Sequence, residues 1–542
     1  MIKADLILKS ENIFDSVSDY PYKGSIAIKD GKIINVCDGE IPSEYLHNGT
    51  KIMDYEDKMI MTSFIDAHDH IYSGIINLSD HMCSDLIKST SEAECIKIIK
   101  EYADSHPNEK RIRGCGWFPA NWGDAALPTK KSLDAVIPDR PVYLMSADNH
   151  TCWLNSKAIE EVGVSTDWDL KTGVVGVGED GKPNGLLIEP EAFKPAMAKM
   201  TDFTKEEFEE IMQEQLQKVV ELGVTTMSDM SAYIPGDHTD SVLEQFKEFN
   251  QSKGLPLRIF FYMALDGNYE YEKVIKYKEK YNDNKIEIGG LKGFIDGVTS
   301  TFTGYLLEPY EDNPGEKGIN CPMIDPDKGS KMIAKANKLG LPVRLHCIGD
   351  AAVRQALDMY EYSIKENGEL DINNSVEHIE VIAPEDMCRF KELGVIASMQ
   401  PAHLPLDMNE KITRCGMKRS KNAWNHKSLL DKGAVLAFGT DFPIVGLNPF
   451  ENIYAAVTRC YANGMPTGTN PWECISVSQA IKAYTIGSAC AYNKQDVMGS
   501  IEVGKYADLI VLDKNIFDID YDQIRSIKPI MTMVNGEIVY ER

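Results

Sequence analysis

Residues 61–70 read MTSFIDAHDH, a strand-like run that closes on two histidines. Successive side chains of a strand point to opposite faces, so His68 and His70, two residues apart, point to the same face. Both imidazoles can therefore reach one ion. The segment predicts the first strand of the fold and, at the end of that strand, a candidate metal site.

Seven further strand-like runs follow, and amphipathic helical patterns such as KEEFEEIMQEQLQKVVEL (205–222) separate most of them. The runs are GVTTMSDM (223–230), LRIFFYMA (257–264), LKGFIDG (291–297), LPVRLHCIG (341–349), NSVEHIE (374–380), GVIASMQ (394–400) and AVLAFGTD (434–441). Eight β-α units predict an α/β fold, a parallel (β/α)8 barrel of the TIM type.

The two ends of the chain resemble each other. ADLILKSENIF (4–14) and ADLIVLDKNIF (507–517) are β-rich runs, and each is followed by a hairpin marked by Asp30-Gly31 or Asn535-Gly536. Asp-Gly and Asn-Gly between alternating apolar residues are strong hairpin signals. Two such pieces are too few for a solenoid, so we expect them to pair as one small sheet module.

Residues from about 75 to 220 interrupt the β-α rhythm after the first strand. They contain a strand of their own, RPVYLMSA (140–147), and a predicted hairpin, GVVGVGEDGKPNGLLIE (173–189). We therefore predict an inserted subdomain that could cover the site. The expected boundaries are 1–60 and 491–542 for the two parts of the terminal module, and 61–490 for the barrel with its insertion.

Composition argues against several classes of protein. The chain has 57 basic and 83 acidic residues and a formal charge of −26. This disfavours binding to nucleic acid or to an anionic membrane, because both need a basic patch. No uncharged apolar run could span a bilayer, and the amino terminus lacks a signal-peptide core. Twelve cysteines without a C-x-x-C pair fit reduced thiols, so we expect a cytoplasmic protein.

Further residues with reactive side chains lie on the predicted strands or at their ends. Lys292 lies on strand four, His346 ends strand five, His378 ends strand six and Asp441 ends strand eight. Strand eight neighbours strand one in a closed barrel, which places Asp441 beside the two histidines of the first strand. Catalytic groups of TIM barrels come from these strand ends. Nitrogen and oxygen ligands of this kind suit zinc or another first-row divalent metal.

Six motifs in this order resemble the amidohydrolase superfamily over nearly the whole chain. They are FIDAHDH, LKGFIDG, HCIGDAAV, VEHIE, GTDFP and GSIEVGKYADLIVL. Further segments are similar to the branch of N-substituted formamide deformylases and YtcJ-like hydrolases, namely GWFPANW (116–122), PDRPVYLMSADNHTCWLNS (138–156), GVTTMSDM, LLEPYED and SMQPAHLPLD (398–407). The resemblance implies a metal-dependent hydrolase with a barrel, a composite terminal β-sandwich and an insertion after strand one.

The resemblance also implies roles for single residues. Metal ligands of the family match His68, His70, His346, His378 and Asp441, and Asp441 also matches the general base. Lys292 falls where relatives carry a lysine carboxylated by carbon dioxide, which bridges two metals. A carbamate offers two anionic oxygens to such ions, whereas a neutral lysine is a poor ligand. The alternative for Lys292 is a salt bridge inside the barrel.

Other residues are candidate substrate contacts, because the family places their segments near the pocket. They are His150, Trp122, Gln400 and His403. A tryptophan could instead pack the insertion against its barrel, and His403 could cap the strand-seven loop. Two departures from the family, Thr62-Ser63 for Pro-Gly and Val298 for a common serine, remove no ligand but affect loop shape and substrate.

The sequence therefore predicts hydrolysis of an amide, formamide or cyclic amide C–N bond by metal-activated water, with Asp441 as base. One or two divalent ions, zinc first among them, and a lysine carbamate are the expected cofactors. A small-molecule amide is the expected partner and a homodimer the expected assembly. The alternatives are an esterase or phosphoesterase on the same scaffold, or a catalytically silent metal-binding regulator. None of the six ligand positions is missing, which disfavours the silent regulator.

Overall fold

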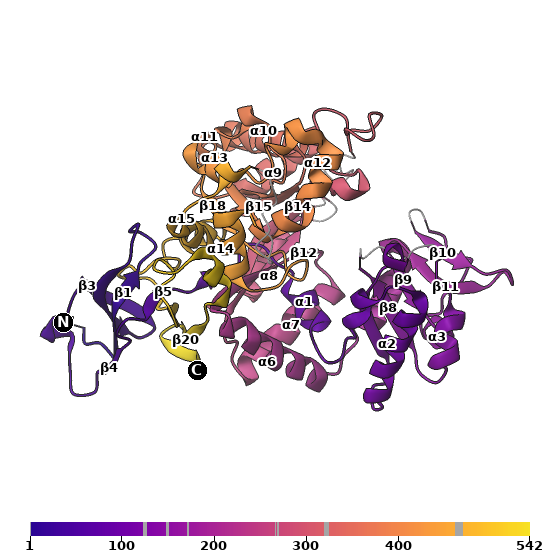
Figure 1. Ribbon diagram of the computed structural model, residues 1–542, viewed down its shortest axis with the longest axis horizontal. Helices are drawn as coiled ribbons and strands as arrows, with labels where there is room; N and C mark the ends of the chain where they lie inside the picture. The colour runs from indigo at the N-terminus through magenta and orange to yellow at the C-terminus, as the bar shows by residue number, and fades with distance from the viewer. Residues whose placement is uncertain are drawn as a thin grey trace. The chain divides into compact units, whose positions relative to one another are not determined.

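A computed structural model describes residues 2–122, 127–147, 151–170, 173–265, 267, 270–318, 325–460 and 470–542. His150, one of the candidate substrate contacts, lies outside them. The chain forms two compact units (Figure 1). The first contains residues 1–71 and 216–542, and the second contains residues 72–215.

The first unit contains an eight-stranded parallel sheet in which the strands follow one another in chain order. They are β6 (Phe64–Ile65), β12 (Val224–Tyr233), β13 (Arg258–Ala264), β14 (Ile286–Phe294), β15 (Val343–Cys347), β16 (Ser375–His378), β17 (Ile396–Met399) and β18 (Leu436–Phe438). Backbone hydrogen bonds join the last strand to the first, since Ala67 N donates to Phe438 O at 3.0 Å. The predicted barrel fold and its eight strands are confirmed.

Helices follow the strands and lie outside them (Figure 1). They are α6 (Lys205–Glu221), α7 (Asp237–Ser252), α8 (Tyr271–Lys280), α9 (Pro326–Lys338), α10 (Asp350–Asn367), α11 (Arg389–Glu392), α12 (Leu404–Ser420), α13 (His426–Asp431), α14 (Pro449–Thr458), α15 (Val477–Lys482) and α16 (Ser488–Ala491). Strands covered in this way are buried on both faces, and every residue of β13 is buried. The strands that carry the site are therefore enclosed by the helices around them.

Strands from both ends of the chain form one further sheet. They are β1 (Leu6–Phe14), β2 (Tyr22–Lys29), β3 (Lys32–Asp38), β4 (Lys51–Asp54), β5 (Met59–Thr62), β19 (Leu509–Leu512), β20 (Pro529–Val534) and β21 (Glu537–Glu541). Antiparallel pairing of β19 with β5 joins the two ends. Both turn residues of each predicted hairpin have positive φ, 48° and 75° at Asp30-Gly31 and 52° and 74° at Asn535-Gly536. The composite terminal module and its hairpins are confirmed.

The second unit has its own five-stranded sheet, in the order β10-β11-β9-β8-β7. The strands are β7 (Ile112–Trp117), β8 (Val142–Ser146), β9 (Thr151–Leu154), β10 (Val174–Val177) and β11 (Pro183–Ile188), with helices α1 (Ile71–Asn77), α2 (Glu92–Ser105), α3 (Lys130–Val136), α4 (Ser156–Val162) and α5 (Pro190–Met200). Trp117 and Trp153 lie in its apolar core. The predicted strand and hairpin of the insertion are β8 and β10–β11.

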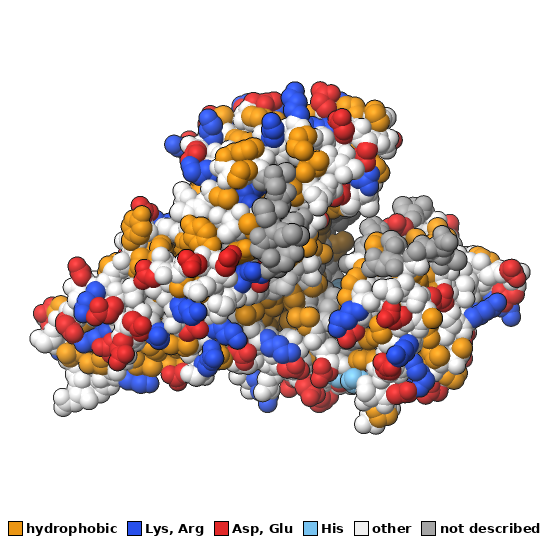
Figure 2. Space-filling view, viewed as in Figure 1, with side chains coloured by type: hydrophobic (Ala, Val, Ile, Leu, Met, Phe, Trp, Pro, Cys, Tyr) orange, Lys and Arg blue, Asp and Glu red, His pale blue; other side chains and the backbone are white. Residues whose placement is uncertain are grey.

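The surface agrees with the composition. Within the described ranges, no helix combines the length and the apolar character that crossing a membrane requires. On the described part of the face in Figure 2, Lys and Arg side chains are interspersed with Asp and Glu rather than gathered in one basic patch.

Candidate metal centre

The predicted ligands lie at the carboxyl ends of the barrel strands. His68 and His70 follow β6, and Asp441 follows β18. The two strand ends are adjacent, because Ala67 N donates a hydrogen bond to Phe438 O. The other members, Lys292, His346 and His378, lie in β14, β15 and β16. The structure thus brings residues from five strands of the barrel to one end.

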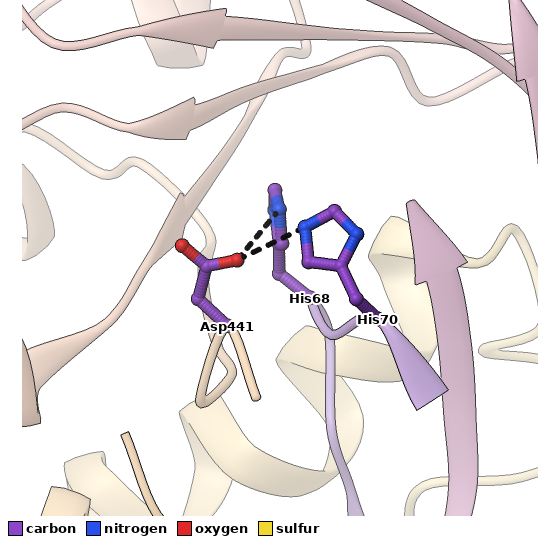
Figure 3. Close-up of side chains that lie close together, drawn as sticks. All are labelled: His68, His70 and Asp441. Carbon is purple, nitrogen blue, oxygen red and sulfur yellow. Dashed lines mark ion pairs between the residues drawn. The ribbon is translucent and has the colours of Figure 1, made fainter. Parts of the chain in front are cut away.

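One carboxylate faces the two histidines of the first strand (Figure 3). Asp441 Oδ1 lies 3.2 Å from His70 Nε2 and 3.5 Å from His68 Nε2. The three potential ligand atoms lie within 4.8 Å of one another. At this spacing one metal ion could contact all three atoms.

The other members of the predicted set adjoin this group. Lys292 Nζ lies 3.4 Å from His68 Nε2. The ring centroid of His378 lies 4.7 Å from that of His68 and 4.5 Å from that of His346. Asp441 Oδ2 lies 3.9 Å from His378 Nδ1, so the carboxylate lies between His378 and the pair of His68 and His70.

The backbone is strained where two of these side chains are placed. His378 has φ 75° and Asp441 has φ 56°, in the left-handed region that non-glycine residues seldom adopt. Asp441 is held there, since its N donates to His68 O at 2.6 Å. Such strain persists where surrounding contacts fix it, and it collects at functional sites.

Three of the histidines have one ring nitrogen held by an oxygen acceptor. His68 Nδ1 donates to Glu377 Oε2 at 2.6 Å. His346 Nε2 donates to the carbonyl oxygen of Gly297 at 3.1 Å, and His378 Nδ1 donates to the side-chain oxygen of Gln400 at 2.9 Å. A neutral imidazole that donates through one nitrogen keeps a lone pair on the other. Each ring is therefore fixed in the tautomer that leaves a nitrogen free to bind a metal.

Burial keeps these rings neutral. Desolvation, with the nearby Lys292 charge, lowers the pKa of His68 and of His346 to about 4 each. Burial also lowers the pKa of His378 well below its usual value, and the neighbouring histidines act in the same direction. Neutral imidazole is the form that binds metal ions.

The pKa values of Asp441 and Lys292 are also shifted in directions that suit a metal centre. Burial by itself raises the pKa of Asp441, but His68, His70 and His378 together hold it well below its usual value. Burial lowers the pKa of Lys292 to about 8. At neutral pH the carboxylate is ionised, and part of the lysine population carries no charge. Neutral imidazoles beside an ionised carboxylate fit zinc or another first-row divalent ion.

The remaining described candidates differ in their surroundings. Trp122 ends a 3-10 turn of the second unit (Pro119–Trp122), and its Nε1 donates to Ser89 Oγ at 3.2 Å. Its ring packs near Trp117 and Trp153, as a core tryptophan does. His403 is buried beside the centre, with Nε2 3.3 Å from Thr440 O. Gln400 holds His378, a role that the sequence did not indicate.

Two functional side chains were not singled out from the sequence, Arg344 and Glu377. Both are fully buried, and Arg344 Nε lies 2.8 Å from Glu377 Oε1. Burial alone would raise the pKa of Glu377, but Arg344 and His68 hold it well below its usual value. Each of the two lies within a buried strand of the barrel, and a buried charge needs a partner.

Comparisons with known proteins extend over nearly the whole chain. The Amidohydrolase family matches residues 51–540. Protein LONG AFTER FAR-RED 3 of Arabidopsis thaliana is 31% identical over 99% of this chain and 92% of its own length. Protein YtcJ of Bacillus subtilis (strain 168), itself assigned as an amidohydrolase, is 28% identical over 96% of each chain. The N-substituted formamide deformylase of Arthrobacter pascens is 25% identical over 91% of this chain and 90% of its own.

A solved structure shows the same fold. An uncharacterized metal-dependent hydrolase from Pyrococcus horikoshii superimposes with a TM-score of 0.77 at 24% identity. The match covers 95% of this chain and 99% of that one, so it includes the terminal sheet and the second unit as well as the barrel.

Proposed function

This chain belongs to the amidohydrolase family and is a metal-dependent hydrolase, and we propose that it cleaves the C–N bond of a small amide, formamide or cyclic amide. The observation that carries the proposal is the set of neutral imidazoles around one ionised carboxylate at the end of the barrel. The relative that is an N-substituted formamide deformylase supports the amide class of substrate.

The metal would be held by His68, His70, His346, His378 and Asp441. Zinc is the ion we propose, as one or two ions per chain, because it favours imidazole nitrogen and carboxylate oxygen. A bound divalent ion supplies two effects, a lower pKa for water and polarisation of the carbonyl under attack.

Asp441 is the proposed general base. Its carboxylate is ionised, and its side chain is 12% exposed, so one edge can reach a water molecule. The carboxylate accepts the proton of the attacking water and returns it to the leaving nitrogen. His70 Nε2 lies 3.2 Å from Oδ1, so this histidine and the carboxylate would contact the same ion.

Lys292 is the proposed site of carboxylation. The lowered pKa exposes the neutral amine, which is the form that attacks carbon dioxide. A bond forms between Nζ and the carbon atom, one proton leaves the nitrogen, and the product is an anionic carbamate with two oxygens. The reaction consumes only carbon dioxide and needs no oxidant or reductant.

A substrate panel tests the proposed reaction. The protein, loaded with zinc, is given matched amide, formamide, ester and phosphoester substrates that carry the same side groups. We expect the amide or formamide to have the highest kcat/KM, and Asp441→Asn to remove that activity. Faster turnover of the ester or phosphoester would overturn the proposed bond specificity and identify an esterase on the same centre.

A further inference from the structure

Asparagine followed directly by glycine occurs five times in the chain, at positions 48, 184, 367, 463 and 535. Glycine has no β-carbon, so its backbone nitrogen can approach the preceding side-chain amide closely. That nitrogen can then attack the amide carbon and displace ammonia, which is the reaction of deamidation. Asn463 lies outside the described residues. The other four pairs place the same reactive dipeptide in different surroundings.

Three of these pairs are held by the fold. The side-chain oxygen of Asn184 accepts a hydrogen bond from the backbone N–H of Leu186 at 3.0 Å. The side-chain oxygen of Asn535 accepts one from Arg258 at 2.5 Å, and Asn367 donates through Nδ2 to a backbone carbonyl oxygen at 2.9 Å. After Asn367 and Asn535, the backbone N–H of the glycine also donates to a carbonyl oxygen, at 2.8 and 3.0 Å. A carbonyl oxygen holds such a nitrogen as an acceptor but is not a base that removes its proton.

Asn48 lies in different surroundings. His47, Asn48 and Gly49 are all exposed, and within the described ranges the Asn48 side chain has no hydrogen-bond partner. The backbone N–H of Gly49 donates to Nδ1 of His47 at 3.0 Å. Imidazole is the side chain that takes up a proton near neutral pH. At this pair, therefore, the attacking nitrogen is already in contact with a base.

Further hydrogen bonds keep the turn in this conformation. Thr50 N donates to His47 O at 3.0 Å, and His47 N donates to Thr50 Oγ1 at 3.0 Å. The same hydroxyl donates to the carbonyl oxygen of Ala4 at 2.7 Å, which ties the turn to the chain just before β1. A base that is held against a reacting nitrogen makes the reaction faster than it is when the two groups must first meet. The fold thus supplies both the base and its placement.

We propose that Asn48 is a site of spontaneous deamidation and that His47 acts as the base. The backbone nitrogen of Gly49 gives its proton to His47 Nδ1 and forms a bond with Cγ of Asn48. The bond between Cγ and Nδ2 breaks, and the amide nitrogen takes the proton back from the imidazole and leaves as ammonia. A water molecule from the solvent then opens the succinimide to aspartate or isoaspartate. The reaction consumes only water and needs no oxidant or reductant.

The product alters one end of the terminal sheet. Aspartate and isoaspartate both add a negative charge to an exposed turn. Isoaspartate also lengthens the backbone between His47 and Thr50 by a methylene group, so the paired hydrogen bonds of these two residues no longer fit. The turn leads directly into β4, whose parallel pairing with β1 begins at Lys51 and Leu6. Deamidation should therefore loosen β4, and the inference is independent of the proposed hydrolase function.

Incubation of the full-length protein at neutral pH tests the site. Samples are digested at intervals, and mass spectrometry of the peptides follows conversion at each Asn-Gly pair, with an isoaspartate assay as a second readout. We expect Asn48 to be converted at least about tenfold faster than the three held asparagines, because each of those must first be released by local unfolding. In guanidinium, where the fold is lost, the four rates should become similar. Equal rates in the folded protein would overturn the proposal.

Two variants separate the base from the turn. His47→Ser keeps an acceptor for the N–H of Gly49 but is not a base, so it should slow the conversion of Asn48 by about tenfold. Gly49→Ala should slow it at least as much, because the added β-carbon hinders the attack and would lie 2.9 Å from Cε1 of His47. Circular dichroism checks that both variants are folded. Conversion of Asn48 at the wild-type rate in folded His47→Ser protein would remove the base and overturn the proposal.

Discussion

The group of His68, His70 and Asp441 and the group of Glu380, His403 and Asp407 each place three potential ligand atoms within 4.8 Å of one another. Both lie where barrel strands end, the second group after β16 and β17. By residue type alone the two groups are equally suited to a metal ion.

The lysines beside them differ. Lys411 Nζ lies 2.7 Å from Glu380 Oε2 and 3.0 Å from Glu410 Oε2, and despite burial these carboxylates raise its pKa. The second group therefore already contains its cation. In the first group, burial outweighs the nearby carboxylates and lowers the pKa of Lys292 to about 8. We propose that the charge on the neighbouring lysine, rather than the ligand types, distinguishes the candidate metal site from the salt-bridge cluster.

Exchanging a carboxylate for an amide in each group should give the largest difference in kcat between the two groups. We expect Asp441→Asn to lower kcat by about 10³-fold or more, because an amide neither accepts a proton nor carries charge. Asp407→Asn should change kcat by less than about threefold, since the proposed proton transfer does not use it. Steady-state kinetics, with circular dichroism to check the fold, measure both. Near-normal turnover in Asp441→Asn protein would remove Asp441 from the role of base.

Removing the lysine of the first group should have the next largest effect. Lys292→Ala should lose metal as well as activity, with kcat lower by about 10²-fold, because the bridging anion contributes several kcal/mol. Acetate, which can occupy the vacated space, should restore part of both. Metal analysis and kinetics with and without acetate test this. In wild-type protein, a carbamate signal from ¹³C-labelled bicarbonate should appear by NMR, and full metal content in Lys292→Ala protein would contradict the bridge.

Much of this comparison could be read from the sequence. Strand ends and hairpins follow local rules. The spacing of His68 and His70 therefore predicted a strand end, and Asn535-Gly536 predicted a hairpin turn, and the fold contains both. The order of the strands then placed Asp441 beside the first pair. Closure of a barrel is a strong constraint, and for that reason residues far apart in the chain could be grouped in advance.

The partners behind the ligands could not be predicted in this way. His68 and Glu377 are 309 residues apart in the chain, and their contact depends on how side chains interleave across the barrel. Gln400 was expected near substrate, but its oxygen holds His378. Local patterns give the strand on which a residue lies, whereas the charge of its neighbour depends on three-dimensional packing.

Removing the lysine of the second group should turn it toward metal binding. Lys411→Met leaves Glu380 buried without its cation, which should destabilise the fold by about 3–5 kcal/mol. The freed carboxylates and His403 could then bind Zn²⁺. An ion at about 100 times its Kd would return about 2.7 kcal/mol of stability. Thermal unfolding with and without zinc measures this, and Lys411→Met combined with His403→Ala is the control that should lose the rescue. A rescue that survives in the double variant would show that zinc acts elsewhere.

The smallest expected effect is a pH-dependent one at Asp407. Burial, followed by the charge of Glu380, raises the pKa of this carboxyl to about 6 from its usual 3.8, and no hydrogen-bond or ion-pair partner for it lies in the described part of the chain. The folded protein thus keeps the proton up to about pH 6, whereas the unfolded chain releases it near 3.8. Stability should therefore fall as pH rises from about 4 through 6, and level off above that. Asp407→Asn removes this ionisation, so its Tm should equal the wild-type value near pH 4 and exceed it by a few degrees at pH 8. The same difference in Tm at both pH values would mean that the substitution acts through packing. The ionisation of Asp407 would then have no effect on stability.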